Sequence, residues 1–437
     1  MKRLSVLLAL VVLAAFACRG GSGGGGETPT PTATPTGSPT PVIGSVSVTA
    51  LDGTSVPQPG VDVFVQSSAG ALQQSLVTNS AGVAVAQNVL AGSMVTVARP
   101  GLNPNEVTVQ TITGVIPGDA ITVTPPTLID NPTNLGSMTV NLPTIAGAAF
   151  YEVETVCGSS SNATPTVSLA VTSDCVTVAG RFDLIALAFD ATGNVTNYAS
   201  MTNVLFANAG SVNVPAWTAA ATLAASFIDA PAGTTSVSWI ASALDANGSI
   251  LLASPAVLSP GPYDFSVPSA PLNVFANHEQ SAFIRFPAVG SNAPYSSITW
   301  VGNGAIDTDL AANALPAIQS ATLDTSSGFT RPSLLVVTSA GVLADATQIL
   351  ESWTSASHTI SWSAFGPGNA RTFRYPELPA AYQIAPGDNL GHPAVLLIES
   401  TVWPGYDAYR AAPVTAPPYI PVVAGRHRLS VFVFNPG

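Results

Sequence analysis

The chain has 437 residues, of which only 8% are charged and 47% are hydrophobic, and its formal net charge is −12. The single lysine is Lys2, so the rest of the chain has no lysine for a P-loop, a Schiff base or a kinase-type site. A surface this acidic repels nucleic-acid phosphates, and no basic patch offsets it, so the composition excludes nucleic acid as a partner.

The first 17 residues have the layout of a secretory signal peptide. A basic start, Met1-Lys2-Arg3, precedes an apolar stretch from Leu4 to Phe16 and the small residue Ala17. A membrane-spanning helix needs about 20 residues to cross the hydrocarbon core, so this stretch is too short for a permanent span. We therefore expect residues 1–17 to be removed.

Cys18 follows directly, and Ala15-Phe16-Ala17-Cys18 resembles the lipobox of bacterial lipoproteins. The resemblance implies that Cys18 carries the acyl chains, palmitate among them, and becomes the new N-terminus. Arg19 stands where Asp marks inner-membrane retention, which favours the outer membrane of a diderm cell. Ordinary secretion with an unmodified Cys18 is the alternative.

A low-complexity segment over residues 18–41 comes next, first rich in Gly and then in alternating Thr and Pro from Glu27 to Pro41. Such a sequence cannot bury a core and prefers extended polyproline II. We interpret it as a tether. It either holds the folded part away from a membrane or is a linker without a selected length.

Cysteine usage supports export, because three cysteines leave one over after a disulfide and lipidation of Cys18 would account for it. Cys157 and Cys175 are then expected to form a disulfide outside the cytoplasm, stabilising the fold by about 3 kcal/mol. Two buried free thiols are the alternative. A metal site is disfavoured because no further cysteine or histidine lies nearby.

From Gly44 onward the chain reads as β-structure: short alternating runs rich in Val, Thr, Ile and Phe, separated by turn residues every 8 to 12 positions. Strands are expected at 45–49, 61–65, 83–85 and 181–189, the last followed by a hairpin turn at 190–194 and a returning strand from 195 to 198. Runs of strands without helical crossovers predict an all-β protein built from tandem antiparallel Ig-like or transthyretin-like sandwiches.

The N-terminal motifs carry a family resemblance. Gly44-x-Val46-x-Val48, Pro59-Gly60-Val61-x-Val63, Thr78-Asn79-x-x-Gly82-Val83-x-Val85, Leu90-Ala91-Gly92 and Val95-x-Val97 resemble the carboxypeptidase regulatory-like domain. The resemblance covers about residues 42–125. It implies a transthyretin-like, seven-stranded, non-catalytic sandwich, which we place at 42–130.

Two further sandwich regions are expected, at 131–262 and 263–437. Residues 234–241 and 357–364 repeat a Thr/Ser/Trp strand pattern, which suggests two related units divided near the Pro-rich stretch 260–271. Residues 307–321 are expected to form either the one helix or a loop.

Catalytic chemistry is scarce. The four histidines, at positions 278, 358, 392 and 427, begin no zinc-binding pattern, so no metal and no cofactor is expected. The Gly-x-Ser-x-Gly string at 20–24 lies in the tether, away from any strand-to-helix elbow. We predict no catalytic residue, although a serine triad around His392 and Asp388 stays open as the arrangement to inspect.

Exposed aromatics are the other candidates for a site, because they stack on sugars or anchor protein partners. Trp403, Tyr406 and Tyr409 cluster near the C-terminus and are the candidate ligand-binding patch; a small C-terminal core is the alternative. The Asp245-to-Gly248 turn lacks the ligand density of a calcium site. The sequons at Asn162, Asn194 and Asn247 are interpreted as turns.

Three candidate functions are compatible with the sequence. The leading one is a non-catalytic lipoprotein of the cell envelope that acts as a structural or interaction module, with a protein or polysaccharide partner at the cell surface. The second is a carbohydrate-binding or adhesive protein that uses the aromatic patch. A hydrolase with an unrecognised site is the distant third.

Overall fold

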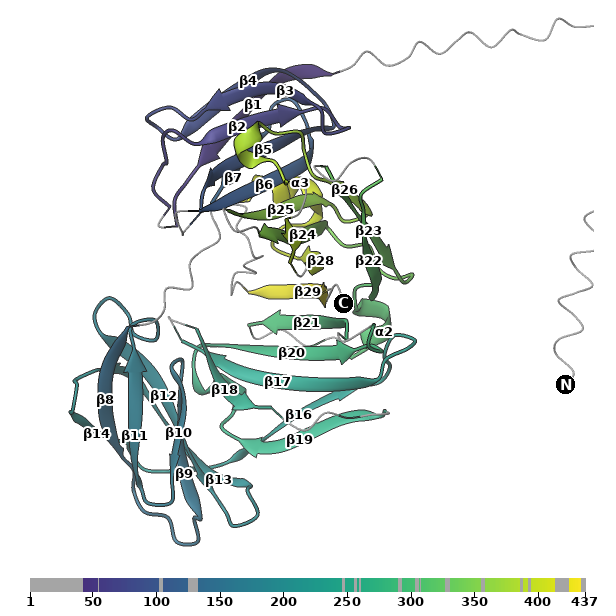
Figure 1. The fold of residues 1–437 in the computed structure, drawn as a ribbon. Helices are drawn as coiled ribbons and strands as arrows, with labels where there is room; N and C mark the ends of the chain where they lie inside the picture. Colours follow the sequence, from purple (N-terminus) through teal and green to yellow (C-terminus); the bar gives the residue numbers. More distant parts are fainter. Residues whose placement is uncertain are drawn as a thin grey trace, which may run out of the picture. The chain divides into compact units, whose positions relative to one another are not determined.

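The structure is a computed structural model. It describes residues 42–433 except 54, 102–104, 125–132, 246–247, 255–257, 259–260, 290–292, 303–305, 307, 327–330, 355–357, 386–387, 392–393 and 413–423. The predicted signal peptide, Cys18 and the tether therefore lie outside the described residues. Strands dominate the described part, so the all-β fold class is confirmed (Figure 1).

The first sandwich packs the sheet β4-β1-β7 against β3-β2-β5-β6. Its core is mostly valine with some alanine and isoleucine, and alternate residues of each strand, such as Val46 and Val48 in β1, point inward. Seven described strands make up this sandwich. They are β1 (Ile43–Ala50), β2 (Asp62–Gln66), β3 (Leu72–Val77), β4 (Val83–Leu90), β5 (Ser93–Pro100), β6 (Glu106–Val115) and β7 (Ala120–Val123).

The second sandwich packs β11-β8-β14 against β10-β9-β12-β13-β15 around its own core. The predicted strand at 181–189 is β12, and it pairs with β13 through the predicted turn, where Asp190 N–H donates to Asn194 O at 3.0 Å. Its strands are β8 (Asn134–Asn141), β9 (Phe150–Thr155), β10 (Gly158–Asn162), β11 (Thr166–Thr172), β12 (Arg181–Phe189), β13 (Val195–Leu205), β14 (Ser211–Asn213) and β15 (Thr218–Ala219).

The predicted disulfide is present in this sandwich. Cys157 lies in the tight turn between β9 and β10, and Cys175 follows β11, with the two Cα atoms 5.0 Å apart. The bond thus joins the end of one sheet to the end of the other.

The third sandwich packs the two-stranded sheet β16-β19 against β18-β17-β20-β21. Its elements are β16 (Ala221–Phe227), β17 (Ser236–Leu244), β18 (Ser249–Ala253), β19 (Tyr263–Ser269), the 3-10 turn η2 (Leu272–Val274), β20 (Asn277–Arg285) and β21 (Tyr295–Val301). The boundary predicted at 262/263 is wrong, because it separates β19 from its antiparallel partner β16. The Pro-rich stretch is not a linker: β19 has a single sheet neighbour, and such an edge strand tolerates Pro268.

The fourth sandwich packs β22-β23-β26 against β24, β25, β28 and β29. Its elements are α2 (Leu310–Asn313), β22 (Ile318–Asp324), β23 (Ser333–Thr338), β24 (Ala346–Thr354), β25 (Thr359–Pro367), β26 (Thr372–Arg374), η3 (Ala380–Tyr382), β27 (Asn389–Leu390), β28 (Ala394–Ser400), α3 (Gly405–Ala411) and β29 (Gly425–Val433).

The helix considered for 307–321 is reduced to the single turn α2. Asp309 caps it by accepting a hydrogen bond from Ala312 N–H at 2.9 Å. It ends before Leu315, which precedes Pro316 and is therefore disfavoured in helical conformation. Ile318 already begins β22.

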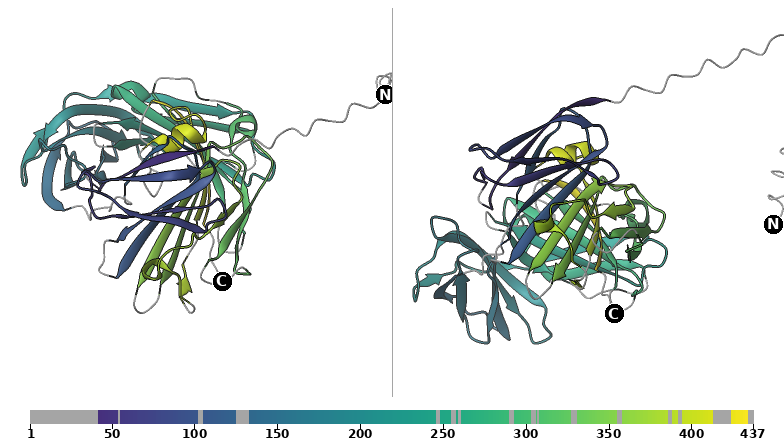
Figure 2. Two further views of the ribbon diagram at one scale, coloured as in Figure 1. Left: turned by 90° about the horizontal axis from the view of Figure 1, so that it is seen from above. Right: turned by 45° about the horizontal axis from the view of Figure 1, so that its top comes forward.

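One 13-stranded sheet, which we call the large sheet, joins the first, third and fourth sandwiches. Its order is β18-β17-β20-β21-β29-β28-β24-β25-β6-β5-β2-β3, with β27 beside β24. Neighbours are antiparallel except β6 and β25, which pair in parallel with Val109 opposite Trp362. Figures 1 and 2 show these strands following one another in a single twisted layer. The first sandwich is therefore not a structurally separate domain, because one of its sheets continues into the C-terminal part of the chain.

Helix α3 covers the large sheet beside the first sandwich. Arg410, only 4% exposed, pairs with Asp119 before β7 at 3.1 Å and donates to the carbonyl oxygen of Gly114. The Tyr406 hydroxyl donates to the carbonyl oxygen of Thr113 at 2.8 Å. These contacts hold the first sandwich to the fourth at a second place.

Candidate functional site

The three aromatics predicted as a ligand-binding patch do not form an exposed platform. Tyr409 is 8% exposed, and its ring meets that of Trp403 edge-on, with centroids 6.0 Å apart and an interplanar angle of 79°. Tyr406 is half-buried, and the Arg410 guanidinium lies over its ring, with the guanidinium carbon Cζ 5.4 Å from the ring centroid. All three pack in a small core with Phe365, so the alternative of a C-terminal core describes them better.

Two described histidines each have a polar partner, one a serine and the other an aspartate. Ser400 Oγ lies 2.9 Å from His427 Nδ1, as neighbours across β28 and β29. The nearest carboxylate in sequence, Glu399, points to the opposite face of the sheet because strand residues alternate. Ser400 and His427 are 2% and 1% exposed, so a substrate cannot reach this hydroxyl in the folded protein.

The second pair is His358 and Asp388, whose Nε2 and Oδ2 atoms are 3.2 Å apart. The same oxygen of the buried Asp388 also accepts a hydrogen bond from Ala385 N–H at 2.8 Å. His392, the histidine expected beside Asp388, lies outside the described residues. The structure thus gives Asp388 a histidine partner that the sequence did not indicate.

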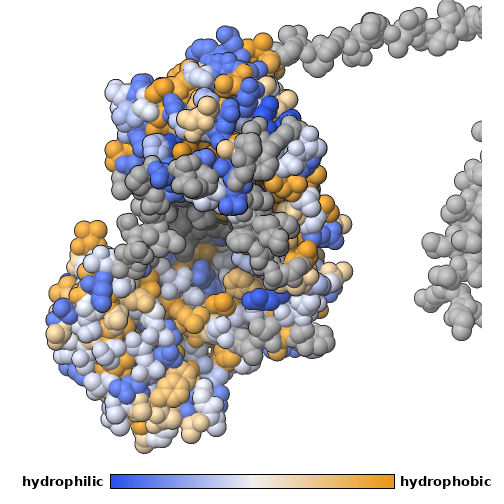
Figure 3. Space-filling model, in the orientation of Figure 1, coloured by the Kyte–Doolittle hydropathy of each residue, from blue (hydrophilic) through white to orange (hydrophobic). Residues whose placement is uncertain are grey.

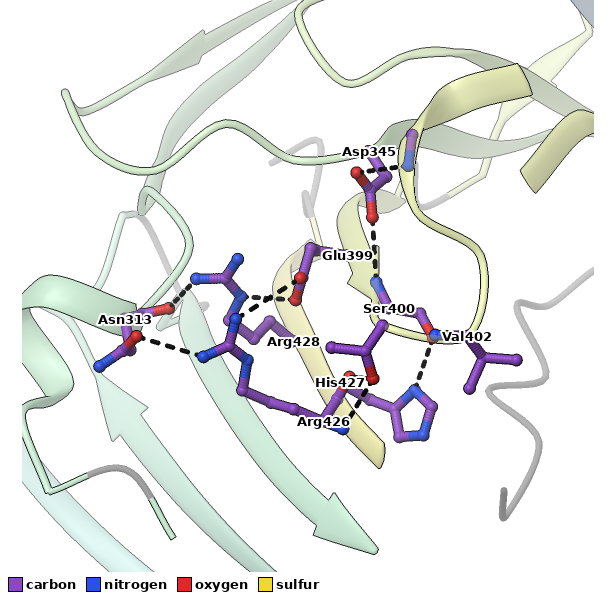
Figure 4. Close-up of polar contacts among 10 residues, drawn as sticks. Asn313, Asp345, Glu399, Ser400, Val402, Arg426, His427 and Arg428 are labelled. Atoms are coloured by element: carbon purple, nitrogen blue, oxygen red, sulfur yellow. Dashed lines mark hydrogen bonds and ion pairs between the residues drawn. The ribbon is translucent and has the colours of Figure 1, made fainter. Parts of the chain in front are cut away.

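Ion pairs lie on the opposite face of the large sheet from the Ser400–His427 pair (Figure 4). Arg428 Nε contacts Glu399 Oε2 at 2.6 Å, and its Nη1 donates to the carbonyl oxygen of Asn313 at 2.7 Å. Arg426 reaches the other Glu399 oxygen at 3.8 Å. These charges fix α2 against β28 and β29, between the cores of the third and fourth sandwiches, which is a structural role.

A groove of about 300 Å³ lies where the second sandwich meets the third. We call it the acidic groove. One wall is the outward face of β9 and β12, with Glu152, Glu154, Leu187 and Phe189; the opposite wall comes from β18 and β19, with Leu251 and Val267. Leu187 and the core of the third sandwich belong to one apolar cluster, which closes the floor. The face of this region drawn in Figure 3 mixes apolar and polar residues.

Strand alternation places both carboxyl groups in the acidic groove. In Phe150-Tyr151-Glu152-Val153-Glu154-Thr155, Tyr151 and Val153 face the core of the second sandwich, so Glu152 and Glu154 face away from it. Sequence reasoning overlooked them, because this pattern is also that of a strand with one solvent-facing side. Only the long-range packing of β18 against β9 converts that side into a groove.

Glu154 is 8% exposed, and neither its side chain nor that of Glu152 has a hydrogen-bond or ion-pair partner among the described residues. Burial, and to a lesser degree the negative charge of Glu152, raises the pKa of Glu154 to about 7. A buried carboxyl group without a partner is costly when ionised. The acidic groove therefore holds a carboxyl group whose ionised form has no partner among the described residues.

The Asp245 turn approaches the second sandwich near a smaller groove, where Asp183 N–H lies 3.4 Å from Asp245 Oδ2. Within the described residues no three His, Cys, Asp or Glu side chains gather as metal ligands. Among the same residues, no helix is both long and apolar enough to cross a lipid bilayer.

No family model matches the chain, and no curated protein matches it. Among solved structures it is similar to the Bacillus anthracis TIE protein at 11% identity, over 58% of this chain and 47% of that one, with a TM-score of 0.15. It is also similar to a tetra-tandem repeat in the extending region of a large adhesion protein, at 14% identity over 81% and 95% of the two chains, with a TM-score of 0.15. A third likeness is to E. coli alpha-2-macroglobulin, at 10% identity over 90% and 28%, with a TM-score of 0.13. TM-scores of this size carry no argument about function.

Proposed function

We propose that the protein is a non-catalytic lipoprotein of the cell envelope, anchored through acylated Cys18 and acting as an interaction module on a Thr-Pro spacer. The observation that carries the proposal is the large sheet. Three sandwiches that share one sheet make a stiff body, and such a body suits a protein that presents a binding surface at a fixed place. A protein or polysaccharide at the cell surface would be its partner.

Two further observations support a non-catalytic role. The Ser400–His427 pair is buried inside the fold. The side chains of Arg426 and Arg428 form ion pairs with Glu399. The aromatic patch that favoured a carbohydrate-binding protein is packed against Phe365. An interaction module that does not use these three aromatics is therefore preferred to the adhesive alternative.

The anchor is tested by changing Cys18→Ser in the full chain and following the protein in its own cell envelope. We expect the wild type to take up labelled palmitate and to sediment with outer membranes, because two or more acyl chains give stable anchoring. The variant should take up no label and leave the membrane fraction. Ser22→Ala, a change of similar size in the same segment, is the matched control. Unaltered sedimentation of the Cys18→Ser protein contradicts the lipid anchor.

A further inference from the structure

We propose that the acidic groove binds a small organic cation, with its amino group against Glu152 and Glu154 and its apolar part against Leu187, Leu251 and Val267. This inference goes beyond the interaction role proposed above, because a small organic cation is neither a protein nor a polysaccharide. It does not depend on the anchor, so a failed binding test and a failed anchoring test are distinguishable.

The size of the acidic groove favours a small molecule. A volume of about 300 Å³ lies at the lower end of the range for ligand sites, which are mostly apolar with a few convergent polar groups. Apolar residues make up most of the described lining of this groove, and among these described residues only the two glutamates titrate. The lining therefore favours a ligand that has one charged group attached to an apolar body.

The charge of the acidic groove specifies the sign of the ligand. Two carboxyl groups lie two residues apart on one strand face, and no described arginine or histidine forms an ion pair with either. Glu154 is nine-tenths buried and unpartnered, so its ionised form carries a desolvation cost that a cation in the groove would remove. An anion would meet like charge, and a neutral ligand would leave the carboxylates unpaired.

A divalent metal is a weaker occupant than an organic cation. Calcium takes six to eight oxygen ligands, whereas the described lining of the acidic groove offers two carboxyl groups and the side-chain oxygens of Asn194 and Ser254 among mostly apolar residues. The apolar walls would gain nothing from a hydrated ion, but they would bury the hydrocarbon part of an amine.

The test measures binding of benzylammonium to the full-length protein by calorimetry at pH 8, beside its uncharged analogue benzyl alcohol and beside CaCl₂. For a ligand of this size we expect a Kd of about 0.1–1 mM for benzylammonium. Benzyl alcohol should bind at least tenfold more weakly, and calcium should neither bind in the groove nor displace the amine. Methyl resonances of Leu187, Leu251 and Val267 should shift with benzylammonium, which locates the site without any substitution.

Glu154→Gln and Glu152→Gln should each weaken benzylammonium binding at least tenfold, because each removes a charge and keeps the side-chain shape. Asp174→Asn is the matched control: it removes an equal charge from an exposed position of the second sandwich, and binding should stay within twofold. Equal binding of the alcohol, displacement of the amine by calcium, or unchanged affinity in both glutamate variants overturns the proposal.

Discussion

Glu351 in β24 is a second carboxyl group without a side-chain partner, and it lies inside the core of the fourth sandwich. It stands opposite Trp362 and between Ile349 and Trp353, on the face that packs in that core. It is 5% exposed, and among the described residues no side chain donates a hydrogen bond to either oxygen, while the backbone N–H of Ser352 only partly opposes the effect of burial on the pKa. Burial raises the pKa of Glu351 from 4.5 to about 8.

This raised pKa makes stability depend on pH. Between about pH 4.5 and 8 the folded protein binds the Glu351 proton more tightly than the unfolded chain does, so stability falls as pH rises through this window. Glu351→Gln removes the ionisation, and we expect it to stabilise the protein by roughly 2–4 kcal/mol at pH 8.5 and by less than about 1 kcal/mol at pH 4.5. Urea unfolding at the two pH values measures the difference, with Asp174→Asn as the exposed control. Equal effects at both pH values would contradict the prediction.

At the scale of elements, the alternation of the sequence predicts strands well and their partners poorly. Residues 181–189 and their hairpin turn follow from local pattern, because turn chemistry and side-chain period act over a few residues. The pairing of β6 with β25 does not follow from local pattern, because nothing in the sequence of residues 106–115 indicates a neighbouring strand near residue 360. The same limit explains the site: Glu152 and Glu154 belong to a predictable strand face, but the covering strand β18 lies about a hundred residues further along the chain.

The contact between Arg410 in helix α3 and Asp119 before β7 allows a prediction about local stability. Arg410→Met removes both contacts with Asp119 and leaves that carboxylate without its buried partner, at an expected cost of about 2–4 kcal/mol. Hydrogen exchange should rise in Ala120–Val123 and in α3, while the second sandwich stays protected. Asp407→Asn is the control: its side chain is 83% exposed, so loss of its pair with Arg410 should cost less than about 0.5 kcal/mol. Uniform loss of protection across the chain would contradict the prediction.

At the scale of the whole molecule, the sandwiches differ in independence. The second has its own two sheets, its own core and the Cys157–Cys175 disulfide. The first shares its sheet with the fourth, so cutting it out exposes the edge of β6 that pairs with β25, over residues 106–112. Exposed edges of this kind pair with other chains.

Two fragments test this difference. Residues 133–220 should fold as a monomer with the disulfide formed, whereas residues 42–124 should dimerise or aggregate through β6. Light scattering after size exclusion gives the masses. Adding Glu to the exposed edge, as Val109→Glu, should restore a monomer of the shorter fragment, and a monomeric wild-type fragment at 100 µM would show that β6 needs no partner.

The pairing of β6 with β25 also imposes a delay during synthesis, because β6 is made long before its partner strand. Thr113 and Phe365, which are hydrogen-bonded across this junction, are 252 residues apart. A ribosome adding about 5–20 residues per second needs roughly 10–50 s to make that interval. Throughout this interval the backbone edge of residues 106–112 has no strand to pair with, because β25 has not yet been made. The nascent chain is therefore the stage at which a holding chaperone would protect this edge most.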